Sequence, residues 1–148
     1  MDKGIDNIAV VYGENQLKAI DDAVYRNFLA RRKGITPFYA VAFNDTKNLM
    51  VSDDILEIMD KVIVHPLFSD YVDLGYDHID NIAEDIDPLA HWAEIEGVFG
   101  SMDGEVLRFI LHMKIPLEKF IRHELAVRGH DENYNQVGLE KAREVWMK

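Results

Sequence analysis

The feature that most constrains this chain is a stretch of 46 residues, 62–107, which contains eleven carboxylates and neither lysine nor arginine. Residues 1–61 carry ten acids against eight bases, and residues 108–148 carry six against eight, so the net charge of −11 arises in this stretch. We call residues 62–107 the acidic block. Charge of this sign repels nucleic acid and anionic membrane, and it attracts cationic protein surfaces or divalent metal ions.

The length and composition predict one globular domain over residues 1–148. A chain of this size with 48% hydrophobic residues can bury a sizeable core, so the acidic block does not indicate disorder. The chain has no cysteine, which excludes disulfide bonds and thiol chemistry. The sequence shows neither a secretory signal pattern nor an apolar run of the about 18 residues that a membrane span needs. We therefore expect a cytoplasmic protein.

Residues 1–51 are expected to contain a small sheet in the order strand, helix, strand, strand. The predicted strands are Asn7–Tyr12, Pro37–Phe43 and Asn48–Val51, which are rich in β-branched and aromatic residues. Between the first two, a helical period runs from Glu14 to a basic tip, Arg31-Arg32-Lys33. The side chains expected on its inward face are Leu17, Ile20, Val24 and Phe28.

Residues 52–148 are expected to form about five helices, which makes the fold α+β and predominantly helical. Ser52 can cap the first helix, which should end before Pro66. Residues 67–76 leave helix, turn and strand open. Val106–Met113 is the most apolar segment and is expected to form a central helix. The other helices are expected over residues 79–86, from Asp87-Pro88 toward Gly97, from Pro116 to Gly129, and around residues 139–146. The side chains expected to point inward are Ile55, Leu56, Met59, Val62, Ile63, Ile79, Ile82, Ala83, Ile86, Leu117, Phe120, Ile121, Leu125, Leu139, Ala142, Val145 and Trp146.

The helix predicted over residues 79–86 combines an apolar face with a row of carboxylates. At 100° per residue, the apolar face spans about 100° of arc, and the acids lie in an arc of about 80° centred about 120° away. The acids of this row are Asp77, Asp80, Glu84 and Asp87, with Asp73 added if the helix extends upstream of Gly75. Like charges at this spacing destabilise a helix by a few tenths of a kcal/mol per pair. No base within the block offsets this cost.

The row has two interpretations. It either matches a basic protein surface, in the manner of a phosphate backbone, or it is a solvated face that keeps the protein soluble. Neighbouring acids on one helix are about 5–6 Å apart, whereas the phosphates of one DNA strand are about 3.4 Å apart along the axis. A phosphate mimic would therefore need a second row, from Glu94, Glu96, Asp103 and Glu105. A charge-matched partner should dissociate as salt rises.

Histidines supply the other candidate sites. His123, Glu124, His130 and Asp131 are of the types that hold zinc or iron, but their spacing is not that of a helical metal site. They define an alternative function, a small or metal-assisted enzyme. His65, His78 and His91 lie in the acidic block, where carboxylates favour the protonated ring, so they either act as local counter-ions or make partner binding pH-sensitive. The chain has no Gly-rich phosphate loop or nucleophile elbow, so we assign no cofactor and no catalytic residue.

The leading prediction is an acidic, non-enzymatic binding protein that occupies a basic, nucleic-acid-binding surface of another protein and inhibits it. Nucleic-acid mimics, anti-defence proteins and immunity proteins use such surfaces, and the likeness here is in charge pattern alone. The expected contact residues are Asp70, Asp73, Asp77, Asp80, Glu84, Asp85, Asp87 and Glu94. Direct binding to nucleic acid or membrane is not expected. A homodimer and a structural module of a larger complex are the further alternatives.

Overall fold

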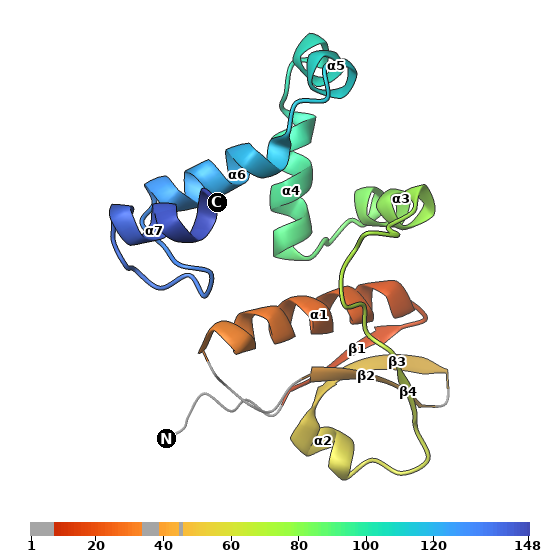
Figure 1. Ribbon diagram of the computed structural model, residues 1–148. Helices are drawn as coiled ribbons and strands as arrows, with labels where there is room; N and C mark the ends of the chain where they lie inside the picture. Colours follow the sequence, from red (N-terminus) through yellow and green to blue (C-terminus); the bar gives the residue numbers. More distant parts are fainter. Residues whose placement is uncertain (1–7, 34–38, 45) are drawn as a thin grey trace. The chain divides into compact units, whose positions relative to one another are not determined.

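The computed structural model describes residues 8–33, 39–44 and 46–148, and these described residues contain four strands and seven helices (Figure 1). The predicted α+β class, mostly helical with a small N-terminal sheet, is confirmed. The chain divides into two compact units, residues 1–94 and 95–148. The single domain over residues 1–148 stays a prediction, because two compact units can belong to one domain. None of the described helices has the length and apolar character of a membrane span.

The first unit is built on an antiparallel four-stranded sheet with the strand order β1-β3-β2-β4. The strands are β1 (Ala9–Gly13), β2 (Tyr39–Asn44), β3 (Lys47–Ser52) and β4 (Ile63–His65). β2 and β3 form a hairpin in which Asn44 pairs with Lys47. Three strands were expected, and their described parts are found. Asn7, Pro37, Phe38 and Asp45 lie outside the described residues.

The helix predicted after Ser52 is wrong in its extent. α2 covers only Asp53–Glu57, and the chain then returns to the sheet as β4, which pairs with β2. Lys61 has a φ of 56°, a conformation that does not continue a helix. The β-branched run 62–64 suits a strand, and the edge of β2 offers it backbone partners. Ser52 precedes α2 but makes no capping bond, because its Oγ accepts a hydrogen bond from the Ile8 amide at 3.3 Å.

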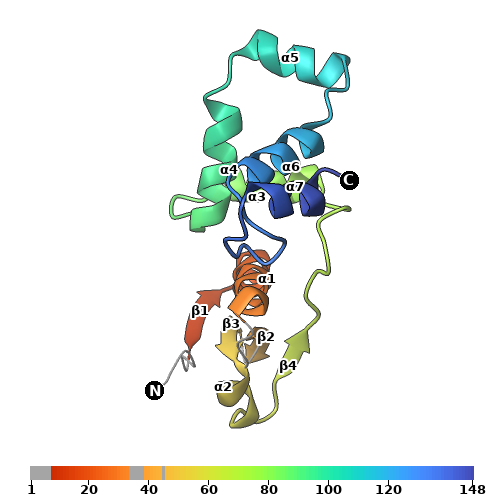
Figure 2. The ribbon, with the colours of Figure 1, turned by 60° about the vertical axis from the view of Figure 1, so that its left-hand side comes forward.

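α1 (Gln16–Lys33) covers one face of the sheet (Figure 2). The helix begins after Asn15, whose Oδ1 accepts a hydrogen bond from the Lys18 amide at 3.1 Å. The core between this helix and the sheet consists of Ala19, Ile20, Ala23, Val41 and Met50. The two alanines allow the helix to approach the strands closely. Phe28 was expected to face inward, but its side chain is 58% exposed.

Residues 67–75 form neither helix nor strand, and the amide of Leu74 bonds to the carbonyl of Tyr71 in a turn. α3 (Tyr76–Glu84) follows, preceded by Gly75 in an extended conformation. The predicted apolar face of this helix is found only at Ile82, which is half-buried. Ile79 is 40% exposed, and Ile86, beyond the helix end, is fully exposed. The buried residue of α3 is His78.

The second unit contains the end of α4 (Ala90–Gly100) and the helices α5 (Gly104–His112), α6 (Leu117–Val127) and α7 (Leu139–Trp146). α6 and α7 pack side by side through buried Ala126 and Ala142, and the Trp146 indole donates to the His130 carbonyl at 2.7 Å. The central position expected for Val106–Met113 is wrong. This segment forms α5, and its apolar side chains are largely exposed, with Leu111 at 74%.

Three further inward-facing predictions in the second unit are wrong. Phe120 is 64% exposed, and Ile121 is 59% exposed. The reason is that α6 packs on α7 through the small side chains Ala126 and Ala142, so the contact uses a narrow strip of the helix. Leu139, at the start of α7, is 56% exposed for the same reason.

Candidate functional site: the acidic face of the first unit

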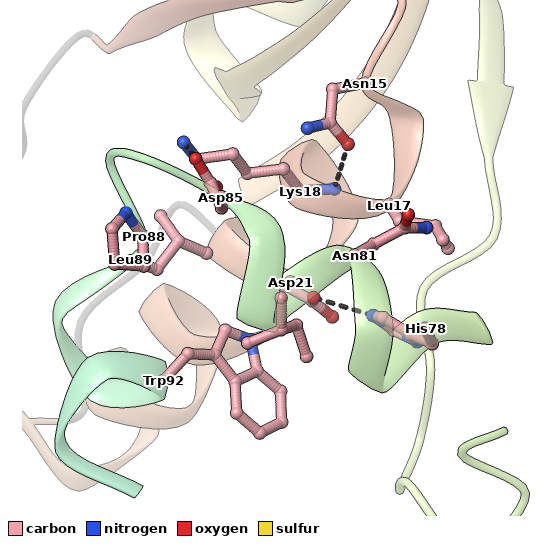
Figure 3. A pocket seen from close by; sticks show the side chains of 11 residues that line it. Asn15, Leu17, Lys18, Asp21, His78, Asn81, Asp85, Pro88, Leu89 and Trp92 are labelled. Carbon is pink, nitrogen blue, oxygen red and sulfur yellow. Dashed lines mark hydrogen bonds and ion pairs between the residues drawn. The ribbon is translucent and has the colours of Figure 1, made fainter. Parts of the chain in front are cut away.

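The acidic helix α3 is attached to α1 by a buried pair of side chains. His78 Nε2 lies 2.8 Å from Asp21 Oδ2, and the two side chains are 11% and 3% exposed. Figure 3 shows the two side chains pointing toward each other, with a dashed line between them. Asp21 lies in the second turn of α1, so the pair holds the first turn of α3 against a helix that is itself packed on the sheet.

The second oxygen of Asp21 is also satisfied. The Tyr71 hydroxyl donates to Asp21 Oδ1 at 2.6 Å, so the carboxylate joins α3 to the segment that precedes it. Burial and this hydrogen bond raise the pKa of Tyr71 well above its usual range. The Tyr71 ring meets the Trp92 ring edge to face, with centroids 5.4 Å apart. The Trp92 indole nitrogen is buried without a hydrogen-bond partner among the described residues.

A lysine of α1 holds the other end of α3. Lys18 Nζ lies 2.9 Å from Asp85 Oδ2 and donates to the carbonyl of Asp87 at 2.6 Å. The hydrogen bond from Lys18, with a second from the Asp87 amide, lowers the pKa of Asp85. Lys18 and Asp21 are one helical turn apart on α1, so a single face of α1 binds both ends of the acidic helix.

The anchoring of His78 determines where the acids of α3 point. At 100° per residue, Asp77, Asp80 and Glu84 lie about 100–160° around the helix from His78, all on the same side. All three side chains are exposed, and none forms an ion pair with a described residue. The predicted row is therefore present in α3 with three members over about 10 Å of helix.

The remaining predicted contact residues lie around this helix. Asp73 precedes Gly75 and is outside the helix, and Asp87 follows its end; both side chains are exposed. Asp70 and Glu94 are also exposed, whereas Asp85 is 19% exposed and paired with Lys18. The acidic block is thus offset at one position by a base from α1, which is a counter-charge that the sequence analysis did not foresee.

The second row of acids stays a prediction, because its members are divided between the two units. Glu96, Asp103 and Glu105 belong to the second unit. Asp103 caps α5 by accepting the Glu105 amide at 2.8 Å, and Glu105 pairs with Arg108 at 2.8 Å. Glu94 alone belongs to the first unit. Within the first unit, the exposed acids of the acidic block are Asp70, Asp73, Asp77, Asp80, Glu84, Asp87 and Glu94. We call the set Asp70, Asp73, Asp77, Asp80 and Glu84 the acidic face.

A second buried carboxylate adjoins Asp21. Asp22 is 7% exposed, and it accepts hydrogen bonds from the Tyr12 hydroxyl and from Arg26 Nε, the latter at 2.9 Å. Burial and the hydrogen bond to Asp22 raise the pKa of Tyr12 well above its usual range. Each of the adjacent aspartates therefore binds one tyrosine hydroxyl and one nitrogen, which agrees with the rule that buried carboxylates are paired.

The histidines of the acidic block differ in role. His78 is paired with Asp21 of α1, so its partner comes from outside the block. His91 stacks on Tyr25 with ring centroids 4.0 Å apart. Burial lowers the pKa of His91 despite the opposing effect of Asp21 and Asp22. The expectation that carboxylates favour its protonated form is wrong, because desolvation outweighs them.

Three of the four residues considered as metal ligands have other contacts. Glu124 pairs with Arg128 at 2.9 Å, and Asp131 accepts the amides of Asn133 and Asn135 at 2.9 and 2.8 Å. His123 is exposed, and the His130 ring contacts the Tyr134 ring with centroids 3.9 Å apart and planes tilted by 41°. Among the described residues, no group of three His, Asp or Glu side chains is arranged to hold a metal ion. The enzyme alternative stays a prediction.

The contact residues predicted from the sequence do not include Asp21, Phe68, Tyr71 or Trp92. The sequence contained a signal for Asp21, since two adjacent aspartates lie inside a predicted helix and the residues on either side of them are apolar.

Comparison with known proteins found no match to a family model, to a curated protein sequence or to a solved structure.

Proposed function

We propose that this protein is a binding protein whose acidic face occupies a basic surface of a partner protein and inhibits it by excluding nucleic acid from that surface. The observation that carries the proposal is the clamped helix α3, which presents Asp77, Asp80 and Glu84 on one side while His78 attaches the other side to α1.

The charge distribution supports this role. The first unit contains 18 carboxylates against 8 lysines and arginines, a net −10, and the second contains 9 against 8, a net −1. Nearly all of the excess charge therefore belongs to the unit that carries the acidic face. A concentrated field of this sign increases the rate of association with a basic surface and disfavours acidic partners.

The anchoring of α3 also supports this role. A face that is held before binding loses less conformational entropy when the complex forms. Both ends of α3 are bound to α1, and α1 is packed on the sheet. A face that served only for solubility would not need this arrangement, since solubility depends on net charge and not on geometry.

The spacing of the acids indicates which kind of partner surface they can contact. Asp77, Asp80 and Glu84 rise by about 4.5 and 6 Å along the helix axis, which is wider than the about 3.4 Å between phosphates of one DNA strand. The face is therefore suited to separate lysines and arginines on a protein, which it would contact in place of a few phosphates, and not to a site that measures phosphate spacing.

Reversal of the charges tests the proposal. The variant Asp77→Lys, Asp80→Lys, Glu84→Lys is compared with the control Asp54→Lys, Glu57→Lys, Asp60→Lys, which changes the net charge equally at exposed positions on and after α2. Partners are captured at about 50 mM salt and eluted at about 500 mM, where screening is strong. We expect the control to retain a salt-sensitive partner and the α3 variant to lose it. Equal retention by both variants would contradict the proposal.

A further inference from the structure

A hollow of about 350 Å³ lies between the start of α3 and the segment before it, lined by residues 68–71, 73–75 and 78. Three rings border it: the centroid distances are 5.3 Å for Phe68–Tyr71, 5.9 Å for Phe68–His78 and 6.2 Å for Tyr71–His78. The rings are tilted by 44–59° to one another, so they present differently oriented surfaces around one space. The faces of the Phe68 and Tyr71 rings attract a cation that lies within about 6 Å of their centroids.

The rings are held in place by the buried network. The Tyr71 hydroxyl and His78 Nε2 bond to the two oxygens of Asp21, at 2.6 and 2.8 Å. The Tyr71 ring is also fixed by its edge-to-face contact with Trp92. The walls of the hollow therefore have their orientation before a ligand arrives, which reduces the entropy lost on binding.

The hollow is negatively charged. Asp70 and Asp73 line it, and no lysine or arginine does. Both carboxylates belong to exposed residues, and among the described residues neither forms an ion pair. One oxygen of Asp70 accepts the Val72 amide at 3.0 Å, which holds that side chain at the rim. The volume lies in the range of small-ligand pockets, about 300–1,000 Å³.

We propose that this hollow binds one arginine side chain of the partner protein. This inference rests on the proposed function and adds an anchor to it. A guanidinium group is planar and weakly hydrated, so it stacks on aromatic rings, and its paired N–H groups match a carboxylate. Asp70 and Asp73 accept these N–H groups at the rim, and Phe68 and Tyr71 contact the flat faces and the aliphatic stem. The arginine enters beside α3, where the acidic face contacts neighbouring bases.

An amide NMR titration of the full chain tests this without any partner. The probe is a blocked tripeptide, glycine-arginine-glycine, and its control contains citrulline, which has the same shape but no charge. We expect the arginine peptide to shift the amides of residues 68–75 and His78, and the citrulline peptide to leave them unchanged. Equal shifts with both peptides, or arginine-dependent shifts confined to other residues, would overturn the inference.

Two variants with the same change of charge distinguish binding in the hollow from attraction to the net negative charge of the protein. Asp73→Asn removes a charge at the rim, and Asp80→Asn removes one on α3 outside the hollow. We expect Asp73→Asn to weaken binding of the arginine peptide by about threefold to fivefold, as for the loss of an exposed charge pair. Asp80→Asn should weaken it less. Equal weakening would overturn the inference, since it would indicate attraction to net charge alone.

The two proposals fail in different ways. If the arginine peptide does not bind here but capture of a partner depends on the α3 acids, only the arginine site is wrong. If the peptide binds here but the α3 variant retains its partner as well as the α2 control does, the arginine site stands and the proposed function is wrong.

Discussion

Asp21 and His78 are separated by 57 residues in the chain, yet His78 Nε2 lies 2.8 Å from Asp21 Oδ2 in a buried pair. This contact joins the sheet-bound helix α1 to the acidic helix α3. The same carboxylate accepts the Tyr71 hydroxyl, so one buried side chain positions both the acidic row and the aromatic hollow beside it. The stability of the unit and its binding surface therefore depend on a common residue.

Removal of His78 should destabilise the first unit. His78→Ala leaves Asp21 buried with one of its two partners, and an unsatisfied bond to a charged group costs about 2–3 kcal/mol. Tyr71→Phe should cost about 1–2 kcal/mol, and the double variant should show a coupling above about 0.5 kcal/mol because both bonds involve one carboxylate. Urea unfolding measures all three. The control His123→Ala is exposed and should change stability by less than about 0.5 kcal/mol. A similar loss in the control and in His78→Ala would contradict the assigned role.

The buried tyrosines should make the protein sensitive to alkali. The pKa values of Tyr12 and Tyr71 are raised by burial and by their bonds to Asp22 and Asp21. Since the folded pKa exceeds the unfolded value of about 10, this stability is fully present below about pH 10 and is lost as pH rises above it. Unfolding midpoints between about pH 8 and 11 should fall less in Tyr71→Phe than in the wild type. Tyr76→Phe, at an 85% exposed position, should follow the wild type.

Because of His91, the free energy of unfolding should decrease in mild acid. Burial lowers its pKa below the usual 6.5, so the unfolded chain takes up a proton that the folded chain does not. Its contribution to stability is therefore present above about pH 6.5 and is lost as pH falls. We expect an NMR titration of the His91 ring with a midpoint below about 6.5. Tyr25→Leu should move the midpoint upward, because it removes the stacked ring. A wild-type midpoint above 6.5 would show that the carboxylates dominate.

The contacts of Lys18 at the end of α3 should stabilise that end independently of the His78–Asp21 pair at its start. Lys18→Met removes the ion pair with Asp85 and the bond to the Asp87 carbonyl, and it should cost about 1 kcal/mol or less. Hydrogen exchange should accelerate at Ile82–Asp85, with little change at Ile79, whose amide bonds to the Gly75 carbonyl next to the His78 anchor. Lys47→Met, at an exposed position, serves as the control. Uniform acceleration along α3 would indicate that Lys18 supports the whole unit.

The elements of this fold follow from local sequence patterns more closely than their packing does. The three N-terminal strands and the helices after residue 76 are found near their predicted positions, because alternation and helical periods are local properties. β4 was missed because its pairing with β2 is a tertiary contact. The buried side of α3 differs from the prediction because Asp21, far away in the chain, provides a partner for His78, so that Ile79 is exposed while Ile82 is half-buried.

The candidate site was predictable to a similar degree. The outward row of Asp77, Asp80 and Glu84 follows from the helical period alone. Which further acids belong to this row depends on where the helix begins and ends. Asp73 is excluded because Gly75, which precedes the helix, has an extended conformation. The pairing of Asp85 with Lys18 requires a contact between segments distant in the chain. The rings of Tyr71 and His78, which border the hollow, are held by Asp21, which is also distant in the chain.

The most direct test of the account is competition between this protein and nucleic acid for a captured basic partner. The measured quantity is the fluorescence anisotropy of a labelled oligonucleotide bound to that partner, during titration with wild type, with the α3 variant or with the α2 control. We predict that the wild type and the control release the oligonucleotide, and that Asp77→Lys, Asp80→Lys, Glu84→Lys does not. Retention of the oligonucleotide in a complex that also contains the wild-type protein would contradict the account.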